Sequence, residues 1–139
     1  MPIGEAELLC DGDDAAVIAI GTMAHEALEA ASELNARGIG TAVLNARFVK
    51  PLDRQRIVAL ARRCRALVTV EEHAGQGGFG AAVLELLADA GVRVPTRCLA
   101  IPDRLIEHGD RDVICAELGL DAAGIARAVA DLLAEHPSR

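Results

Sequence analysis

Apolar and polar positions alternate along the chain in a way that predicts strands followed by helices. Ala15–Ile20 is a continuous apolar run with no polar face, which is typical of a strand buried on both sides of a parallel sheet. Further strands are expected within Thr41–Phe48, Ala66–Val70 and Val92–Ile101. Ala6–Cys10 alternates more weakly and precedes a turn, so we expect an antiparallel edge strand that forms a hairpin with Ala15–Ile20.

Helical spacing of apolar residues follows each expected strand. The first expected helix begins at Met23. Four more are expected over Arg54–Cys64, Ala81–Ala90, Arg111–Leu118 and Ala122–Glu135. Thr22, Asp53 and Asp121 stand where N-cap residues are preferred. This alternation predicts a single domain over residues 1–139, an α/β three-layer, doubly wound and mostly parallel sheet with one antiparallel edge strand.

Composition excludes several classes of function. The chain of 139 residues is 52% hydrophobic, carries a net charge of −7 and has two Phe but no Trp or Tyr. Acidic charge and the scarcity of aromatic side chains disfavour nucleic-acid partners. No apolar run reaches the length of a membrane span and no signal peptide is evident, so we expect a cytoplasmic protein without membrane contact. The four Cys and four His are scattered, without the spacing of a zinc site.

Candidate functional residues gather where the expected strands end. The segments Gly21-Thr22, Arg47, Glu71–His73 and Asp103-Arg104 all follow strands. Open α/β sheets bind ligands beyond the carboxyl ends of their strands. We therefore expect these residues to share one rim of the sheet.

The glycines after the third main strand permit a nucleotide-binding hypothesis. Gly75, Gly77 and Gly80 fit the pattern G-x-G-x-x-G, and Asp103 follows at a distance suited to a ribose contact. However, His73-Ala74 lengthens a turn that should be tight, and the motif stands in the third unit instead of the first. Close backbone packing is the favoured role of these glycines.

Glu71, Glu72 and His73 also permit a hypothesis of acid/base or metal chemistry. Alternation along a strand would let Glu71 and His73 converge while Glu72 points away. Two groups do not complete a metal site, and no nucleophile elbow is present. Hydrogen bonding to neighbouring loops or to a partner is therefore favoured. The basic face of the helix Arg54–Cys64 is likewise assigned to solvent or a partner in preference to phosphate.

Four longer motifs carry a family resemblance. In chain order they are Asn45-Ala-Arg-Phe-Val-Lys-Pro-Leu-Asp53, Val70–His73 with Gly77–Gly80, Pro102–Gly109 and Ala116–Asp121. With this order and spacing, essentially the whole chain resembles the C-terminal domain of the 1-deoxy-D-xylulose-5-phosphate synthases of the transketolase family. The resemblance implies the third α/β domain of a homodimeric enzyme, which packs beside the missing N-terminal and central domains.

The resemblance also implies an activity for the intact enzyme. Such synthases use thiamine diphosphate and Mg²⁺ to join pyruvate to glyceraldehyde 3-phosphate with loss of carbon dioxide, for isoprenoid, thiamine and pyridoxal biosynthesis. The thiamine-diphosphate motif, Gly-Asp-Gly followed by paired asparagines, is absent from the chain. No catalytic, cofactor-binding or metal-binding residue is therefore assigned here, and we expect no catalysis from the domain alone.

The singled-out residues are therefore candidates for an interface or for the rim of a substrate channel. We expect Arg47 and Asp53 to orient their loop against a neighbouring domain, and His73 is the candidate for approaching the channel. The full set is Arg47, Asp53, Glu72, His73, Gly77, Gly78, Asp103, Arg104 and His108. The alternative is a freestanding small α/β domain that binds a nucleotide or another small ligand for regulation. That alternative predicts a closed strand-end pocket, whereas an enzyme fragment predicts an exposed apolar face.

Overall fold

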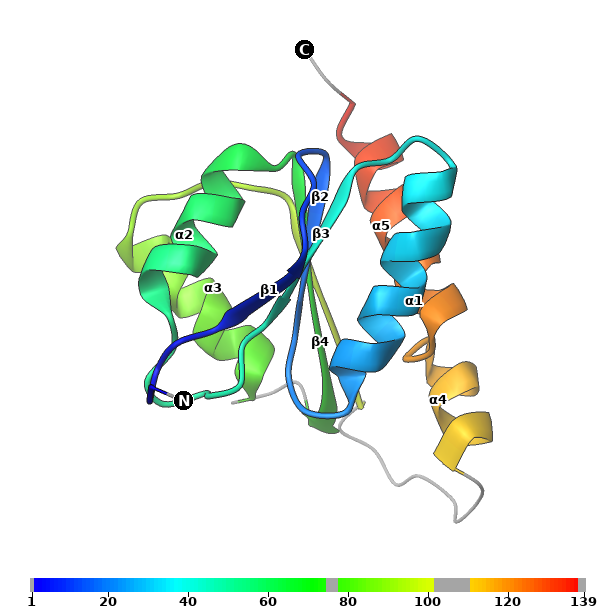
Figure 1. The fold of residues 1–139 in the computed structure, drawn as a ribbon, viewed down its shortest axis with the longest axis horizontal. Coiled ribbons are helices and arrows are strands. Elements are labelled where there is room, and N and C mark those ends of the chain that lie inside the picture. The colour runs from blue at the N-terminus through cyan, green and yellow to red at the C-terminus, as the bar shows by residue number, and fades with distance from the viewer. Residues whose placement is uncertain (1, 75–77, 102–110, 138–139) are drawn as a thin grey trace.

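The computed structural model describes residues 2–74, 78–101 and 111–137, which form a five-stranded sheet between two layers of helices (Figure 1). The order across the sheet is β1-β3-β2-β4-β5. The strands are β1 (Glu7–Cys10), β2 (Ala15–Ala19), β3 (Thr41–Asn45), β4 (Ala66–Ala74) and β5 (Thr96–Ile101). All neighbours are parallel except β1 and β3. The predicted doubly wound sheet with one antiparallel edge strand is confirmed.

Helices lie on both sides of this sheet. The helices α2 (Arg54–Arg63) and α3 (Phe79–Asp89) cover one face, and α1 (Met23–Ala36) and α5 (Ala122–Glu135) cover the other (Figure 1). The short helix α4 (Arg111–Leu118) lies on the same side as α1 and α5. Among the described helices none is both long and apolar enough to cross a membrane.

The edge strand β1 pairs with a different strand from the one predicted. Glu7 lies opposite Asn45 of β3, and Leu8 lies opposite Leu44. The predicted hairpin with β2 is wrong, because both edges of β2 are already taken by β3 and β4. Complete burial of the five residues of β2 is the sign of a central strand with neighbours on both sides.

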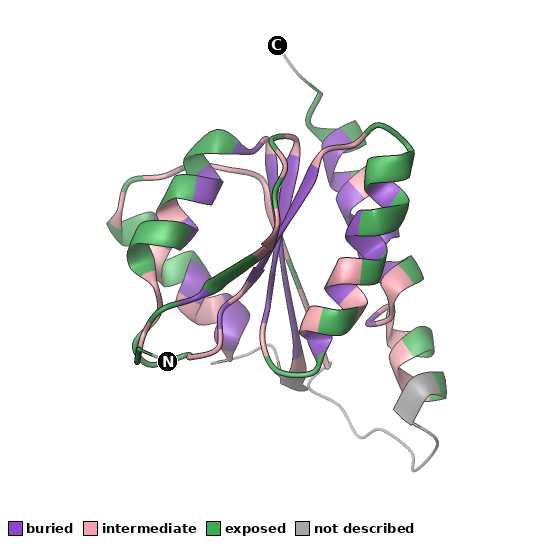
Figure 2. Cartoon of the chain, viewed as in Figure 1, coloured by how far each residue is buried: buried purple, intermediate pink, exposed green. Residues whose placement is uncertain are grey.

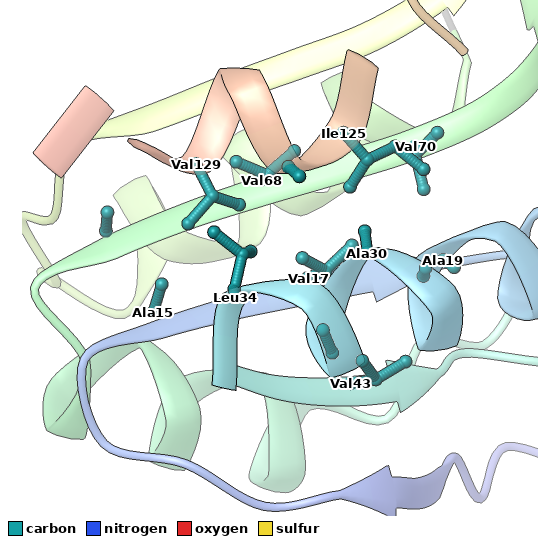
Figure 3. Close-up of a cluster of buried hydrophobic side chains, with 14 of the residues drawn as sticks. Ala15, Val17, Ala19, Ala30, Leu34, Val43, Val68, Val70, Ile125 and Val129 are labelled. Atoms are coloured by element: carbon teal, nitrogen blue, oxygen red, sulfur yellow. The ribbon is translucent and has the colours of Figure 1, made fainter. Parts of the chain in front are cut away.

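The core fills both spaces between sheet and helices (Figure 2). Alternate residues of β2 serve opposite faces, since Val17 packs with α1 and α5 whereas Ile18 packs with α2 and α3. On the first face, Leu34 of α1 and Val129 of α5 meet over β2 and β4 (Figure 3). Full burial of an aliphatic side chain contributes about 2 kcal/mol relative to exposure, so these two clusters hold the layers together.

The ends of the helices show where local sequence signals suffice. The side chains of Asp53 and Asp121 accept hydrogen bonds from the N–H groups of Arg56 and Gly124, so both predicted caps are confirmed. Thr22 occupies the predicted N-cap position of α1, but its side chain makes no cap bond to the helix. Its hydroxyl donates to Glu72 instead, 2.9 Å away.

Several boundaries differ from their predictions, and β4, for example, extends to Ala74 instead of ending at Val70. Helix α3 begins at Phe79, two residues before the expected Ala81, and β5 begins at Thr96 instead of Val92. The earlier start of α3 has a physical cause in β4, described below. Pro95 directly precedes β5, as expected for a residue that favours the beginning of a strand.

Candidate functional site at the carboxyl ends of the strands

A pocket of about 410 Å³ lies at the carboxyl ends of β2 and β4. The loops that follow β2, β3 and β4 all contribute to it. Its lining consists of Ile20, Gly21, Thr22, Val49, Glu71, Glu72, Gly78 and Phe79. The structure thus brings together several residues that the sequence assigned to a common rim, and it adds Ile20, Val49 and Phe79.

Glu71 forms the buried floor of this site. Its side chain is 1% exposed, and each carboxylate oxygen accepts one hydrogen bond from the start of α3. Oε1 lies 2.9 Å from the amide nitrogen of Phe79, and Oε2 lies 2.6 Å from that of Gly80. A carboxylate at a helix N-terminus is stabilised by the free N–H groups and by the helix dipole. Glu71 therefore caps α3 from a neighbouring strand, which explains why the helix begins at Phe79.

This contact argues against the nucleotide-binding hypothesis. In dinucleotide-binding folds the N–H groups at the helix N-terminus hold the pyrophosphate. Here the N–H groups of Phe79 and Gly80 already bind an internal carboxylate. A phosphate placed there would have to displace Glu71 or meet its negative charge.

Gly80 has the packing role that the sequence favoured for the glycines. A Cβ atom at this position would lie 2.9 Å from both Cys98 Sγ and Thr69 Oγ1, which is closer than van der Waals contact allows. Glycine lets the first turn of α3 lie directly against β4 and β5. Gly75 and Gly77 lie outside the described residues.

Glu72 points to the other side of β4. Its Oε2 accepts a hydrogen bond from the hydroxyl of Thr22 at 2.9 Å, and its Oε1 accepts one from the thiol of Cys115 at 3.7 Å. Glu72 thereby connects β4 to the start of α1 and to α4. The prediction that Glu71 and Glu72 face opposite ways is confirmed. The predicted convergence of His73 on Glu71 concerns a side chain outside the described part of the chain.

Arg47 and Asp53 fasten the loop after β3 to the N-terminal segment. Arg47, with a φ of 61°, places Nη2 2.5 Å from Oε2 of Glu7 on β1. Oδ2 of Asp53 accepts the N–H of Ala6 at 2.8 Å and pairs with Arg56 at the same distance. Both side chains thus make contacts inside this chain, while the predicted contact with a neighbouring domain stays a prediction.

The environment of Asp53 changes its acidity. Burial favours the neutral acid, but the hydrogen bonds from Ala6 and Arg56 together with the charge of Arg56 outweigh it and hold the pKa of Asp53 below its ordinary value. Asp53 is therefore ionised at neutral pH, in the state that caps α2.

The basic face of α2 is largely neutralised. Arg54 pairs with Asp89 at 2.8 Å, and Arg63 pairs with Asp11 and with Asp13, the latter at 2.9 Å. Guanidinium groups held by carboxylates are poorly placed to bind a phosphate group. This supports assigning the face to solvent or a partner.

The described residues contain no group of three or more His, Cys, Asp or Glu side chains that could hold a metal ion. Gly77, Asp103, Arg104 and His108 lie outside the described residues, so their predicted positions on the rim stay predictions. Sequence reasoning overlooked Val49, which is 37% exposed in the pocket wall. No local signal singles out Val49, because Ala46, Phe48 and Leu52 of the same loop are apolar as well.

Comparison with protein families and curated sequences gives concordant results. The model of the family described as transketolase, C-terminal domain, matches residues 4–125. The 1-deoxy-D-xylulose-5-phosphate synthase 1 of Geobacter sulfurreducens is 55% identical over 135 residues, 96% of this chain but 21% of that protein. The synthase of Gloeobacter violaceus is 47% identical over 137 residues, 99% of this chain and 22% of that protein. The chain thus spans about a fifth of the length of these relatives.

Solved structures show the same arrangement of strands and helices. A split-gene transketolase, described as an inactive β4 tetramer, superposes with a TM-score of 0.88 and 34% identity over 99% of this chain and 44% of that one. A variant transketolase from Pichia stipitis superposes with a TM-score of 0.67 over 98% of this chain and 19% of that one, at 15% identity. At that identity the second comparison supports the fold alone.

Proposed function

The chain belongs to the transketolase C-terminal domain family, and from this we propose that it is the C-terminal domain of a 1-deoxy-D-xylulose-5-phosphate synthase. One observation carries the proposal. Relatives with that name match 96% and 99% of the chain at 55% and 47% identity, while the chain accounts for only 21% and 22% of their length. A separate domain of such a synthase explains both facts.

The parent enzyme would be a cytoplasmic homodimer that condenses pyruvate with glyceraldehyde 3-phosphate, with loss of carbon dioxide. Thiamine diphosphate and Mg²⁺ would supply this chemistry in its preceding domains. The residues described here do not fit either group, because the N–H groups of Phe79 and Gly80 are taken by Glu71. A metal-binding cluster is also missing from the described part of the chain. No catalytic step is therefore assigned to this domain.

The domain's own contribution would be structural. Two observations support a surface role toward protein in preference to a phosphorylated ligand. The buried carboxylate of Glu71 occupies the start of α3, and the rim is lined by Gly21, Thr22 and Glu72. We propose that this rim faces the preceding domains and helps to build the dimer. Its members would be Arg47, Asp53, Glu72, His73, Gly77, Gly78, Asp103, Arg104 and His108.

The proposal is tested on the full-length polypeptide that contains this chain. We expect it to form 1-deoxy-D-xylulose 5-phosphate from pyruvate and glyceraldehyde 3-phosphate, and we expect deletion of residues 2–139 to abolish activity and weaken dimerisation. A truncated protein with unchanged turnover and an unchanged dimer would contradict the structural role. A full-length protein without synthase activity would contradict the identity of the parent enzyme.

The strand-end pocket keeps a second candidate function open. Its volume of about 410 Å³ falls within the range of small-molecule sites. A freestanding domain that binds a nucleotide or another small ligand would use this space. Saturable thermal stabilisation of the protein by NAD or ATP would favour this candidate, whereas the contact between Glu71 and α3 predicts no stabilisation.

A further inference from the structure

One wall of the strand-end pocket is an exposed apolar side chain. Val49 is 37% exposed, and it lines the pocket together with Ile20 and the buried ring of Phe79. Single exposed hydrophobic residues are common on protein surfaces. Val49 differs because it borders a concave space whose other walls are largely apolar or backbone.

The charge at the floor of the pocket is already satisfied. Both carboxylate oxygens of Glu71 receive N–H groups of α3, at 2.9 and 2.6 Å. The floor therefore does not require a cation, and burial of an apolar group against Ile20, Val49 and Phe79 would gain free energy in proportion to the area removed from water.

The N-terminal segment lies at the same end of the molecule as this pocket. In Figure 1 the chain enters β1 from the end at which β2 passes into α1. The N–H of Ala6 donates to Asp53, and a Cβ atom at Gly4 would lie 2.9 Å from Cγ of Pro51. The segment before β1 is thus held against the loop that carries Val49, and Ile3 beside it is 79% exposed.

Resting on the proposed function, we propose that the pocket receives an apolar side chain from the domain that precedes this one in the same polypeptide. The curated relatives extend over about five times the matched length, and the matching family is a C-terminal domain, so the remainder would precede it. That remainder would join the N-terminal segment, which lies against Pro51 in the loop that carries Val49. A tethered partner has a high effective concentration, so a small apolar contact is sufficient to fix its orientation.

The first test is a labelling experiment on the full-length polypeptide. Val49→Cys and Leu84→Cys place a thiol at two positions of similar exposure in this chain, 37% and 45%. The second lies on the outer face of α3 and is the matched control. We expect the thiol of Val49→Cys to react with a maleimide about tenfold more slowly, measured by mass spectrometry of the modified peptides, because a covered thiol reacts only when its cover opens. A ratio below about threefold would overturn the proposal.

The second test disturbs the contact. Val49→Arg should increase the rate of proteolysis at the junction before Pro2 by about tenfold, because an undocked domain exposes its linker. Val49→Ile preserves the apolar contact and should leave the rate unchanged, as should Leu84→Arg. Equal cleavage of Val49→Arg and the wild type would contradict the docking contact.

Further outcomes separate this inference from the proposed function. A reading frame without a preceding domain, or an inactive full-length protein, would contradict the proposed function and the docking contact together. An active synthase in which Val49→Cys reacts as fast as Leu84→Cys would contradict the docking contact alone. Loss of protection on dilution to monomers would assign the contact to the partner subunit and overturn the contact within one polypeptide.

Discussion

Glu71 and Glu72 are adjacent carboxylates at the end of β4, and the structure uses them in opposite ways. Glu71 is buried and binds two backbone N–H groups of α3, which belong to the next element in the chain. Glu72 is half-buried and accepts hydrogen bonds from side chains of α4 and of the residue before α1. The first contact closes a corner of the sheet, whereas the second lies on a rim that other molecules can reach.

The difference shows that residue type and position on a strand do not determine what a carboxylate does. Alternation sends the two side chains to opposite faces, and the element on each face then decides the role. A helix N-terminus offers fixed N–H donors and a favourable dipole. A hydroxyl and a thiol offer donors that can turn away. We therefore expect substitutions at the Glu71 corner to affect stability more than substitutions at the Glu72 rim.

The largest effect is expected for Glu71→Ala. Removing this carboxylate leaves two buried N–H groups without their acceptor, which should lower the free energy of unfolding by about 3 kcal/mol. Urea unfolding of the protein measures the change. Glu71→Gln, which keeps one acceptor oxygen, should lose about half as much. Equal losses for Glu71→Gln and Glu72→Gln would remove the distinction between the two sites.

A smaller loss is expected for Gly80→Ala. The added methyl group would meet Cys98 and Thr69 at 2.9 Å and push α3 away from the sheet, at a cost of about 2 kcal/mol. Gly78→Ala is the matched control, because its φ of −89° suits any residue. If Gly80→Ala unfolds at the same urea concentration as the wild type, the close packing of α3 against β4 is not required.

Asp53 gives a third comparison, since it caps a helix near the surface and its charge can be titrated. Its folded pKa is lowered, so its contribution is complete above the unfolded pKa of about 3.9 and is lost as the pH falls through the folded value. Asp53→Asn keeps an oxygen that can cap α2 but replaces the second oxygen, which accepts from Ala6 and Arg56, so it should cost about 1 kcal/mol at pH 7 and progressively less below pH 4. Unfolding curves across this range test the sign. A difference that grows toward low pH would contradict it.

The smallest effect is expected at the rim. In a double-mutant cycle, Thr22→Val and Glu72→Ala should show a coupling energy of about 0.5 kcal/mol, typical of a partly exposed hydrogen bond. Chemical denaturation of the four proteins provides the cycle. A coupling as large as the loss at Glu71→Ala would mean that the rim is as rigid as the corner.

Much of the fold could be predicted because its signals are local. The bounds of α4 and α5 match their predictions, because helical periodicity and the Asp121 cap depend only on residues that are close in the sequence. The partner of β1 could not be predicted, because pairing with β3 depends on which edges of the sheet are already filled. A hairpin is the local alternative, and the sequence alone contains no signal against it.

The same distinction applies to the candidate site. Strand ends are readable in the sequence, so Gly21, Thr22, Glu71 and Glu72 were expected to share a rim. The hydrogen bonds that Glu71 accepts from the N–H groups of Phe79 and Gly80 could not be predicted, because they depend on how the chain turns between β4 and α3. The glycine pattern permitted a nucleotide-binding hypothesis beside the favoured packing role, and only the folded chain shows the carboxylate that occupies the helix N-terminus.

The most direct test of the contact between Glu71 and the start of α3 is an NMR titration of the protein with ATP and with NAD. The amide signals of Phe79 and Gly80 report on the N–H groups that Glu71 holds. We expect these two signals to stay in place at millimolar nucleotide, because the internal carboxylate occupies the position of a phosphate group. Saturable shifts of both amides would contradict this account and restore the nucleotide-binding hypothesis.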